Sequence, residues 1–268
     1  MVQEAKGRTE AVIAAAKELK KSLMKYLFTY GPVPVDEAED VALKETEIGE
    51  MPDGWPVRRL AEVCEVKTST IEIGSLGEVD TGATTDVLVH GIKVADMNTP
   101  GNEREIRRAG IEVRVPARIA SRRTVPVASV VFPKRGAAIA TNKKRLTTTW
   151  TALDPNLIAV IPNADLDPSF LHAWFLTFDI ASIQSPGPTP QLNKKDVEPV
   201  ELPVPGLNLQ RGVASAIARV DAKIEAEENR KRALEELFRT LLNELMTAKI
   251  RVNDIEVSSR PVMPMDSG

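Results

Sequence analysis

The segment LFRTLLNELMT at residues 237–247 repeats the segment LKKSLMKYLFT at residues 19–29. The two segments share three leucines at the same spacing, and the glutamate before and the threonine at the end of each segment also match. A helix repeated at both ends of a globular stretch indicates that the chain starts at the tail of one structural unit and then carries one complete further unit. We expect the two helices to pair with each other or with copies in a second chain.

Both repeats lie in longer helical patterns, at residues 1–30 and 206–250. Apolar residues recur there at alternating steps of three and four, which places them on one face of a helix. In the second pattern the heptad seam includes two polar positions, Glu227 and Lys231, and such a seam requires a partner helix. The predicted helix-pairing residues are Leu19, Leu23, Leu27, Ile217, Val220, Ile224, Leu234, Phe238, Leu241 and Leu245.

A strand-rich domain is predicted between the helices, at residues 51–205. Short β-branched runs such as DVLVHGIKV and VPVASVVF are separated there by turn residues. Asp167 and Pro168 predict the start of a helix whose aromatic face belongs to the core. The acidic stretch 31–50 is interpreted as a surface linker, and the polar residues 251–268 as a flexible tail. The predicted fold class is therefore α+β.

Composition excludes several classes of protein. The 268 residues are 43% hydrophobic and 27% charged, and no apolar run approaches the length of about 18 residues that a membrane span needs. The first residues contain no continuous apolar segment of a secretory signal. The single cysteine, Cys64, has no partner for a disulfide or a zinc site and is interpreted as a buried small hydrophobe. We expect a cytoplasmic protein without membrane association.

Positive charge is concentrated in the middle of the chain, although the net charge is -3. Residues 101–145 hold twelve basic and three acidic side chains, a local balance of +9. A clustered positive field attracts polyanions such as DNA, whereas the alternative interpretation is a solvated surface that keeps the domain soluble. The candidate DNA-binding residues are Arg107, Arg108, Arg114, Arg118, Arg122, Arg123, Lys134, Arg135, Asn142, Lys143, Lys144 and Arg145.

The motifs of common enzymes are missing from the sequence. There is no glycine-rich phosphate loop, no HExxH and no GxSxG, and the two histidines, His90 and His172, are far apart in apolar surroundings. We therefore expect no catalytic residue, no metal site and no cofactor in this chain. Arginine and lysine in turns contact phosphates, and Asn142 has the chemistry to read adenine, although an asparagine there is also a common turn residue.

Five segments resemble the specificity subunit of type I restriction-modification systems. They are MPDGWPVRRLAEVCEV (51–66), HGIKVADMN (90–98), FLHAWFLTFDI (170–180), PTPQLNKKDVEPVELPVPGLNLQ (188–210) and LLNELMTAKIRV (241–252). The join into the long helix at 191–210 is the most specific of these, and the resemblance covers about residues 10 to 252. Leu209 departs from the family pattern, which has an acidic residue before the glutamine Gln210.

The resemblance implies one target-recognition domain and long helices that form an antiparallel coiled-coil spacer. Family members usually carry two recognition domains, each of which reads one half of a split DNA target, so this chain resembles a half-length form. Methylation of adenine and DNA cleavage belong to separate modification and restriction subunits, where S-adenosylmethionine, ATP and magnesium are expected. A half-length chain is expected to form a homodimer or to pair with another specificity subunit.

The sequence thus leads to the hypothesis of a non-catalytic DNA-binding specificity subunit that directs its partner subunits to a bipartite target. Two alternatives from other classes remain open. A coiled-coil scaffold without nucleic acid explains the heptads equally well, although it does not explain the basic cluster. A stand-alone DNA nuclease or methyltransferase requires a catalytic constellation that the sequence does not display.

Overall fold

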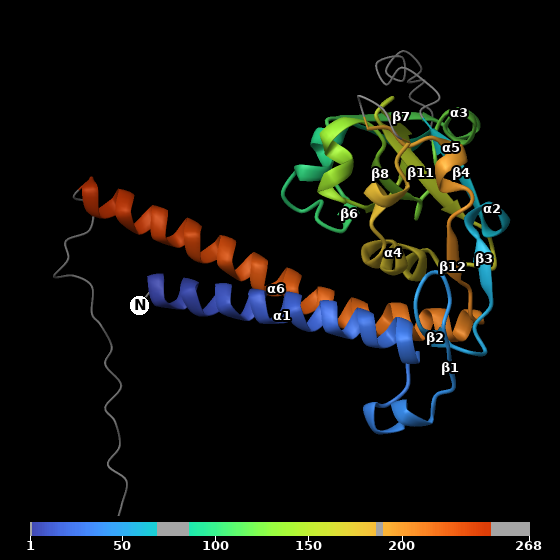
Figure 1. Cartoon of the computed structure of the whole chain (residues 1–268). Coiled ribbons are helices and arrows are strands. Elements are labelled where there is room, and N and C mark those ends of the chain that lie inside the picture. The colour runs from blue at the N-terminus through green and yellow to red at the C-terminus, as the bar shows by residue number, and fades with distance from the viewer. Residues whose placement is uncertain (1, 69–85, 186–189, 248–268) are drawn as a thin grey trace, which may run out of the picture. The chain divides into compact units, whose positions relative to one another are not determined.

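The computed structural model describes residues 2–68, 86–185 and 190–247 (Figure 1). The chain divides into two compact units. One is helical and consists of residues 2–20 and 220–247, and the other, at residues 21–219, contains helices and strands. The predicted tail at 251–268 lies outside the described residues, as do residues 248–250 of the predicted last helix.

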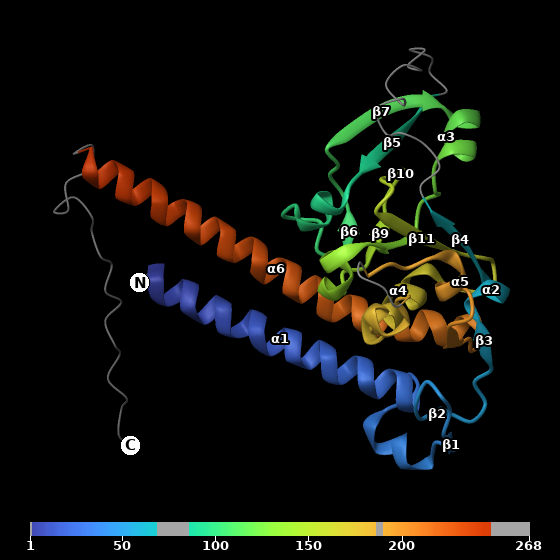
Figure 2. The same cartoon turned by 45° about the horizontal axis from the view of Figure 1, so that its top comes forward.

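The helical unit is formed by the first part of α1 (Val2–Tyr30) and the second part of α6 (Leu207–Met246), which run antiparallel (Figures 1 and 2). Salt bridges join successive turns of the two helices. They are Lys6–Glu235 at 2.9 Å, Lys231–Glu10 at 2.8 Å, Lys17–Glu228 at 2.8 Å and Lys20–Asp221 at 2.6 Å. Because residue numbers rise on one helix as they fall on the other, these pairs fix an antiparallel register. The predicted antiparallel helix pairing is confirmed.

The buried face of α6 follows the predicted heptads in this unit. Ile224 and Glu227 are buried. The partly buried positions at the same spacing are Val220, Lys231, Leu234, Phe238, Leu241 and Leu245. A seam with steps of three and four keeps facing the partner helix, because it matches the turn of a coiled coil. The heptad spacing therefore predicts the pairing face of α6 correctly.

The predicted face of α1 is wrong in part. Leu19 is 58% exposed, whereas Thr9, Ile13 and Ala16 are the buried positions. The buried face of α1 thus carries small and β-branched side chains, and Lys20 at its end forms a salt bridge with Asp221. Leu19, although it belongs to the repeated leucine pattern, thus faces solvent.

Three other predicted pairing residues, Leu23, Leu27 and Ile217, belong to the mixed unit. Leu27 and Ile217 are buried in its largest hydrophobic cluster, together with Met24 and Val213, and Leu23 packs against that cluster. They are core residues of the domain and not of the helix pair in residues 2–20 and 220–247, because α1 and α6 both continue into the second unit.

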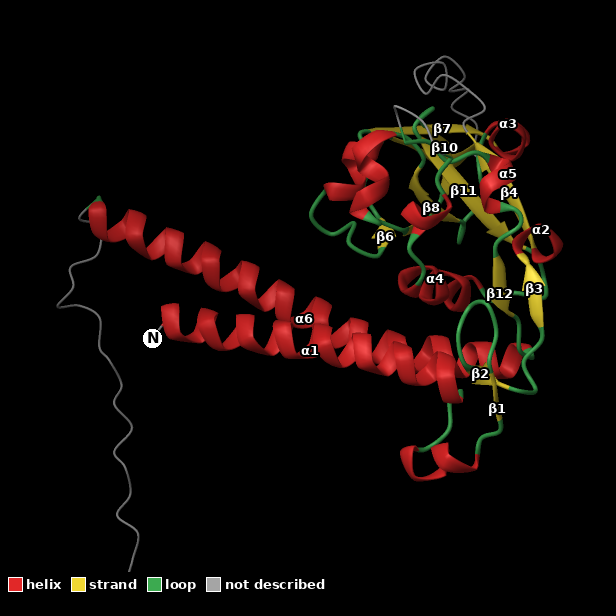
Figure 3. Cartoon of the chain, viewed as in Figure 1, coloured by secondary structure: helices red, strands yellow, loops and turns green. Residues whose placement is uncertain are grey.

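The mixed unit contains two main sheets and two short strand pairs (Figure 3). The five-stranded sheet has the order β4 (Cys64–Thr68), β11 (Leu157–Pro162), β8 (Val130–Pro133), β9 (Arg145–Thr147), β6 (Glu105–Ile106). The three-stranded sheet has the order β10 (Trp150–Leu153), β5 (Asp86–Ile92), β7 (Ile111–Pro116). The short antiparallel pairs are β1 (Leu43–Lys44) with β2 (Met51–Pro52) and β3 (Val57–Arg59) with β12 (Glu201–Pro203).

Short helices connect these strands. They are η1 (Val35–Asp40), α2 (Leu60–Val63), η3 (Val94–Asn98), α3 (Ala117–Arg123), η4 (Gly136–Thr141), α4 (Pro168–Thr177), η5 (Ile180–Ile183) and α5 (Lys194–Val197). The register β5–β7 is antiparallel, whereas β10–β5 and β6–β9 are parallel. The predicted α+β class is confirmed.

The acidic stretch 31–50 is ordered as part of this unit, so its interpretation as a linker is wrong. It forms η1, and its strand β1 pairs with β2 across the predicted domain boundary. Lys44 ties the segment down, since its Nζ donates to the carbonyl oxygens of Asp53 at 2.6 Å and Trp55 at 2.7 Å. The acidic side chains lie mostly at the surface while the backbone pairs, which explains why composition alone resembles a linker.

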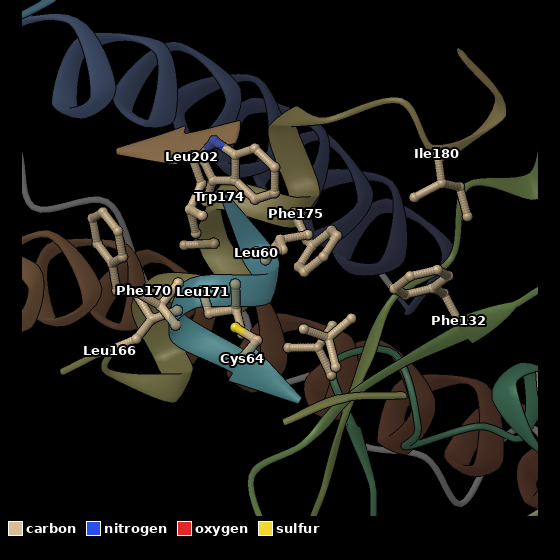
Figure 4. Close-up of a cluster of buried hydrophobic side chains, with 14 of the residues drawn as sticks. Leu60, Cys64, Phe132, Leu166, Phe170, Leu171, Trp174, Phe175, Ile180 and Leu202 are labelled. Carbon is tan, nitrogen blue, oxygen red and sulfur yellow. The ribbon is translucent and has the colours of Figure 1, made fainter. Parts of the chain in front are cut away.

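The core of the mixed unit lies around α4 (Figure 4). Asp167 caps this helix as predicted, since its Oδ1 accepts from the backbone N–H groups of Ser169 at 2.9 Å and Phe170 at 3.1 Å. Phe175 lies 5.4 Å from Phe132 of β8, measured between ring centroids. Burial raises the pKa of the nearby Cys64 thiol to about 12, so this cysteine is an inert core residue, as predicted.

Gln210 joins the start of α6 to the loop before α4. Its side chain is fully buried; Nε2 donates to the carbonyl oxygens of Asp165 at 2.9 Å and Pro205 at 2.7 Å, and Oε1 accepts from the N–H of Asp167 at 2.7 Å. One amide thus satisfies three backbone groups of two segments that are 40 residues apart in the chain. This clasp fixes the start of α6 to the loop before α4 within the mixed unit.

Candidate nucleic-acid interface

Helix α3 carries one group of exposed arginines. Ala120 is buried on the side of α3 that faces the three-stranded sheet, where it packs in one cluster with Val89 and Val115. The helix is short and only one side of it is covered, so Arg118, Arg122 and Arg123 are left exposed. A shallow hollow of about 320 Å³ lies among these side chains and is lined by Arg118, Ile119, Arg122 and Arg123.

The guanidinium groups of two of these arginines are unpaired in the described part of the chain. Within residues 2–68, 86–185 and 190–247, no salt bridge or hydrogen bond engages the guanidinium group of Arg118 or Arg122. Their Cα atoms are one helical turn apart, so both groups leave the same side of α3. Two unpaired guanidinium groups on one side of a helix have the charge and the forked donors that bind phosphate oxygens.

Arg114 lies on the other face of the sheet that α3 covers. Val113 and Val115 point toward α3 with their hydrophobic cluster, and because successive side chains of a strand alternate, Arg114 points away. Its Nη1 lies 3.4 Å from the carbonyl oxygen of Asp86 on the neighbouring strand. Arg114 is exposed, but it does not share a surface with the arginines of α3.

A second exposed group, Arg107 and Arg108, lies in the loop between β6 and β7. The loop is held by Asn102, which is fully buried. Its Oδ1 accepts from the backbone N–H groups of both arginines at 2.9 and 3.1 Å, and its Nδ2 donates to the carbonyl oxygens of Asp96 at 2.8 Å and Arg108 at 2.7 Å. Sequence reasoning missed Asn102, because a lone asparagine beside glycine reads as a turn residue. Its four hydrogen bonds position the two arginines.

Lys143 and Arg145 lie where β9 begins, and both contact η3. Lys143 Nζ donates to Asn98 Oδ1, and Arg145 Nη2 donates to the carbonyl oxygen of Met97 at 3.3 Å. Arg145 Nη1 also donates to the carbonyl oxygen of Lys144 at 2.9 Å, and burial lowers the pKa of this guanidinium. These two side chains fasten η3 to the five-stranded sheet and are only partly open to a ligand.

Lys144 is wrong as a DNA-binding residue. It is 1% exposed, and its Nζ donates to the carbonyl oxygen of Phe178 at 2.7 Å and to Asn142 Oδ1 at 2.6 Å. Burial lowers the pKa of this ammonium to about 8. The ammonium group of Lys144 is buried in the domain and is not accessible to a phosphate.

Asn142 has a structural role in the fold. Its φ of +52° lies in the left-handed region, which asparagine tolerates better than most residues, and it ends η4 there. Its Oδ1 accepts from Lys144 Nζ and from the N–H of Ile180 at 3.1 Å. Through this oxygen the side chain joins η4 to η5.

Lys134 and Arg135 follow β8 at a third place. Burial lowers the pKa of Lys134, and its carbonyl oxygen accepts from the N–H of Leu192 at 2.9 Å. Arg135 is exposed and forms an isolated antiparallel bridge with Gln191 through the backbone. The described part of the chain therefore does not gather the twelve predicted residues into one patch.

The arginine groups of α3 and of the β6–β7 loop stand at opposite ends of β7. Arg107 and Arg108 precede its first residue and α3 follows its last residue (Figure 2). Six residues of strand extend about 20 Å at about 3.3 Å per residue. That length corresponds to about six base pairs of duplex, since successive nucleotides on one strand are about 3.4 Å apart along the helix axis.

No metal centre is found in the described residues, where no three His, Cys, Asp or Glu side chains lie close enough to hold an ion. His90 lies 3.5 Å from Glu112, measured from Nε2 to Oε1, but it is buried and desolvation lowers its pKa. None of the described helices is long and apolar enough to cross a membrane.

The chain is similar to type I restriction specificity subunits. Among curated proteins it is 24% identical over 250 residues to a protein of Methanocaldococcus jannaschii described as a type I restriction enzyme MjaX specificity subunit, and the match covers 92% of this chain and 54% of that protein. No protein-family model matches the chain.

Two solved structures share the fold. The HsdS subunit from Thermoanaerobacter tengcongensis has a TM-score of 0.51 at 15% identity, over 91% of this chain and 55% of that one. The type I restriction-modification system S subunit from M. genitalium has a TM-score of 0.58 at 16% identity, over 91% of this chain and 57% of that one.

The chain spans about half the length of these relatives. Both kinds of comparison bear out the resemblance noted in the sequence, and the chain has the fold of about half of a type I specificity subunit.

Proposed function

We propose that this chain is a sequence-specific DNA-binding specificity subunit of a type I restriction-modification complex, in a half-length form with one target-recognition domain. The observation that carries the proposal is the pair of uncommitted guanidinium groups on α3, in a domain of specificity-subunit fold. Charged groups left unpaired at a surface are available to phosphates, and phosphate contacts supply most of the salt-dependent affinity of DNA-binding proteins.

The positions of the arginines suggest how a duplex would be held. Arg118 and Arg122 at one end of β7 and Arg107 and Arg108 at the other are spaced for phosphates about six base pairs apart. Phosphate contacts of this kind set the orientation of the protein on the duplex, and base edges are then read by side chains between them. Asn102 would serve as a positioning residue, because it holds the second pair in place.

Catalysis is assigned to partner chains in this proposal. The modification subunit would bind S-adenosylmethionine, and the restriction subunit would bind ATP and magnesium. The present chain would supply one of two recognition domains, either as a homodimer or together with another specificity subunit. A two-fold homodimer would read an interrupted palindrome, because the symmetry of the protein is repeated in the target.

Duplex binding at several salt concentrations tests the proposal. The variant Arg118→Gln/Arg122→Gln loses two phosphate contacts, so the slope of log K against log salt should become less steep by about 1.8, at about 0.9 per phosphate. The control Lys25→Gln/Arg219→Gln removes the same charge from exposed positions of α1 and α6 and should leave the slope unchanged. Equal slopes for both variants would show that the arginines of α3 do not contact DNA phosphates.

A coiled-coil scaffold without nucleic acid is the second candidate, because the ion-paired helices α1 and α6 form a heptad seam of their own. The same titration separates the two candidates. A scaffold would bind neither specific nor random duplex at low salt.

A further inference from the structure

The turn at residues 126–129, between α3 and β8, has a backbone conformation that its sequence does not favour. Ala128 has a φ of +63°. In the described part of the chain the only other non-glycine residue in the left-handed region is Asn142, whose side chain forms local hydrogen bonds. Alanine has no polar side chain that would compensate, so the conformation of Ala128 has to be imposed by its surroundings.

Thr147 of β9 imposes this conformation. Its Oγ1 donates to the carbonyl oxygen of Pro126 at 2.7 Å and accepts from the N–H of Ser129 at 3.0 Å. Its carbonyl oxygen accepts from the N–H of Ala128 at 2.8 Å, and the hydroxyl of Ser129 donates to the carbonyl oxygen of Pro126 at 2.8 Å. Thr147 and Ser129 are both buried. Four hydrogen bonds on the buried side therefore hold the turn in its strained form.

The tip of this turn presents Val127 to solvent. Its side chain is 53% exposed, although turns are more often made of glycine, asparagine, aspartate or serine. A single exposed valine is ordinary on a protein surface, but this one stands on a strained backbone that is held in place, and its β-branched side chain has little freedom at χ1. Strained backbone is found most often where a side chain has to be held toward a ligand.

Val127 lies close to the arginines of α3. It follows Arg123 by four residues, so their Cα atoms are at most about 14 Å apart. Val125, between them, is anchored to β10, since its N–H donates to the carbonyl oxygen of Thr151 at 2.8 Å and its carbonyl oxygen accepts from the N–H of Thr151 at 2.9 Å. The path from the end of α3 to the turn is thus fixed.

The same turn is also joined to the second group of arginines. Thr148, the neighbour of Thr147, donates from Oγ1 to the carbonyl oxygen of Ile106 at 2.5 Å, and Ile106 directly precedes Arg107. Ile106 also stands beside Thr147 in the parallel register of β6 and β9. The turn therefore belongs to the series of contacts that links Arg107 and Arg108 to α3.

We propose that Val127 is a base-reading residue that contacts the 5-methyl group of a thymine in the major groove. The proposal rests on the proposed function, because the arginines of the two groups would hold the duplex against the turn. An aliphatic side chain has no hydrogen-bond donor or acceptor, and the thymine methyl is the apolar group that base edges expose in the major groove. The rigid turn favours recognition, because a side chain that is already fixed loses little freedom when it meets the base.

The test removes single methyl groups from the DNA. The full chain selects duplexes from a random library, and each thymine of the enriched sequence is then replaced in turn by uracil, which pairs in the same way but lacks the 5-methyl group. For the unchanged chain one of these replacements should weaken binding about fourfold, the value for burial of one methyl group. For Val127→Ala the same replacement should have no effect, and the salt dependence of binding should be unchanged, because the variant alters no charge.

The matched control is Val35→Ala, which truncates a valine that is 79% exposed on η1. This control should keep the fourfold loss at the same uracil. Both substitutions are at the surface, so both variants should have the melting temperature of the unchanged chain.

Two results would overturn this proposal and leave the proposed function intact. One is an enriched sequence in which no thymine is sensitive to uracil, and the other is equal sensitivity of the unchanged chain and Val127→Ala. A chain that enriches no sequence at all would contradict the proposed function, and the role of Val127 with it.

Discussion

Replacement of Gln210 by leucine should strongly destabilise the mixed unit, because the buried side chain of Gln210 holds the start of α6 to the loop before α4. The side chain volume is nearly kept, but the three hydrogen bonds to Asp165, Asp167 and Pro205 are lost. The bond to Pro205 is buried, and the other two are partly buried. A buried polar group left without a partner costs about 1–3 kcal/mol, whereas a group that water reaches costs less.

The expected loss is therefore about 3 kcal/mol in the free energy of unfolding. One buried carbonyl contributes most of it, and two partly buried groups contribute the rest. For a unit of this size, about 1 kcal/mol lowers the melting temperature by about 2–4 °C, so the shift should be about 6–12 °C. Calorimetry and urea titration of the same samples give both quantities.

The matched control is Leu209→Ala, at the neighbouring residue, which is 43% exposed. It should shift the melting temperature by less than about 2 °C, because surface substitutions away from a network change stability by about 0.5 kcal/mol or less. If Gln210→Leu and the control have the same melting temperature, the three hydrogen bonds contribute little to stability, and Gln210 does not fix the start of α6.

Three further predictions concern the core and the helix pair. In the folded chain the pKa of Lys144 is about 8, below its ordinary 10.5. Between these two pH values the unfolded chain binds more protons than the folded chain. The free energy of unfolding of the unchanged protein should therefore rise from pH 8 to pH 10.5 relative to that of Lys144→Met. Urea titrations at pH 7, 9 and 10 measure the difference, and parallel curves would contradict it. Lys231→Glu should weaken the helix pair by less than about 1 kcal/mol, and Glu10→Lys in the same chain should restore it, as followed by thermal circular dichroism. One heptad inserted into both helices should widen the preferred gap between half-sites by about three base pairs, since it adds about 10 Å of helix; an unchanged gap in binding selections would exclude a spacer role.

Hydrophobic periodicity predicts the buried face of a helix that packs against one partner. It fails for a helix that packs against different elements along its length. The heptads of α6 identify its buried face from Val220 to Phe238, because this part of the seam faces a single partner helix, α1. In α1 the spacing of the leucines predicts that Leu19 is buried, but Thr9, Ile13 and Ala16 are the buried positions. The sequence also shows no sign that Leu27 enters the domain core, because the cluster that contains it is assembled from residues between Met24 and Ile217.

Charge composition predicts the candidate interface in the same limited way. It selects the exposed Arg118 and Arg122 but also Lys144, which is buried and hydrogen-bonded to the carbonyl oxygen of Phe178. The difference arises from tertiary packing, which a count of basic residues does not contain. Asn102 illustrates the reverse case, because its importance lies in four backbone contacts made after folding.

The central claim is that this chain reads a DNA sequence, and selection from random duplexes tests it most directly. The purified chain, alone and with a modification subunit, is incubated with a random library, and bound duplexes are sequenced over several rounds. The account predicts enrichment of a defined base pattern that weakens for Arg118→Gln/Arg122→Gln. Recovery of duplexes without any common pattern, or of no duplexes at all, would contradict it.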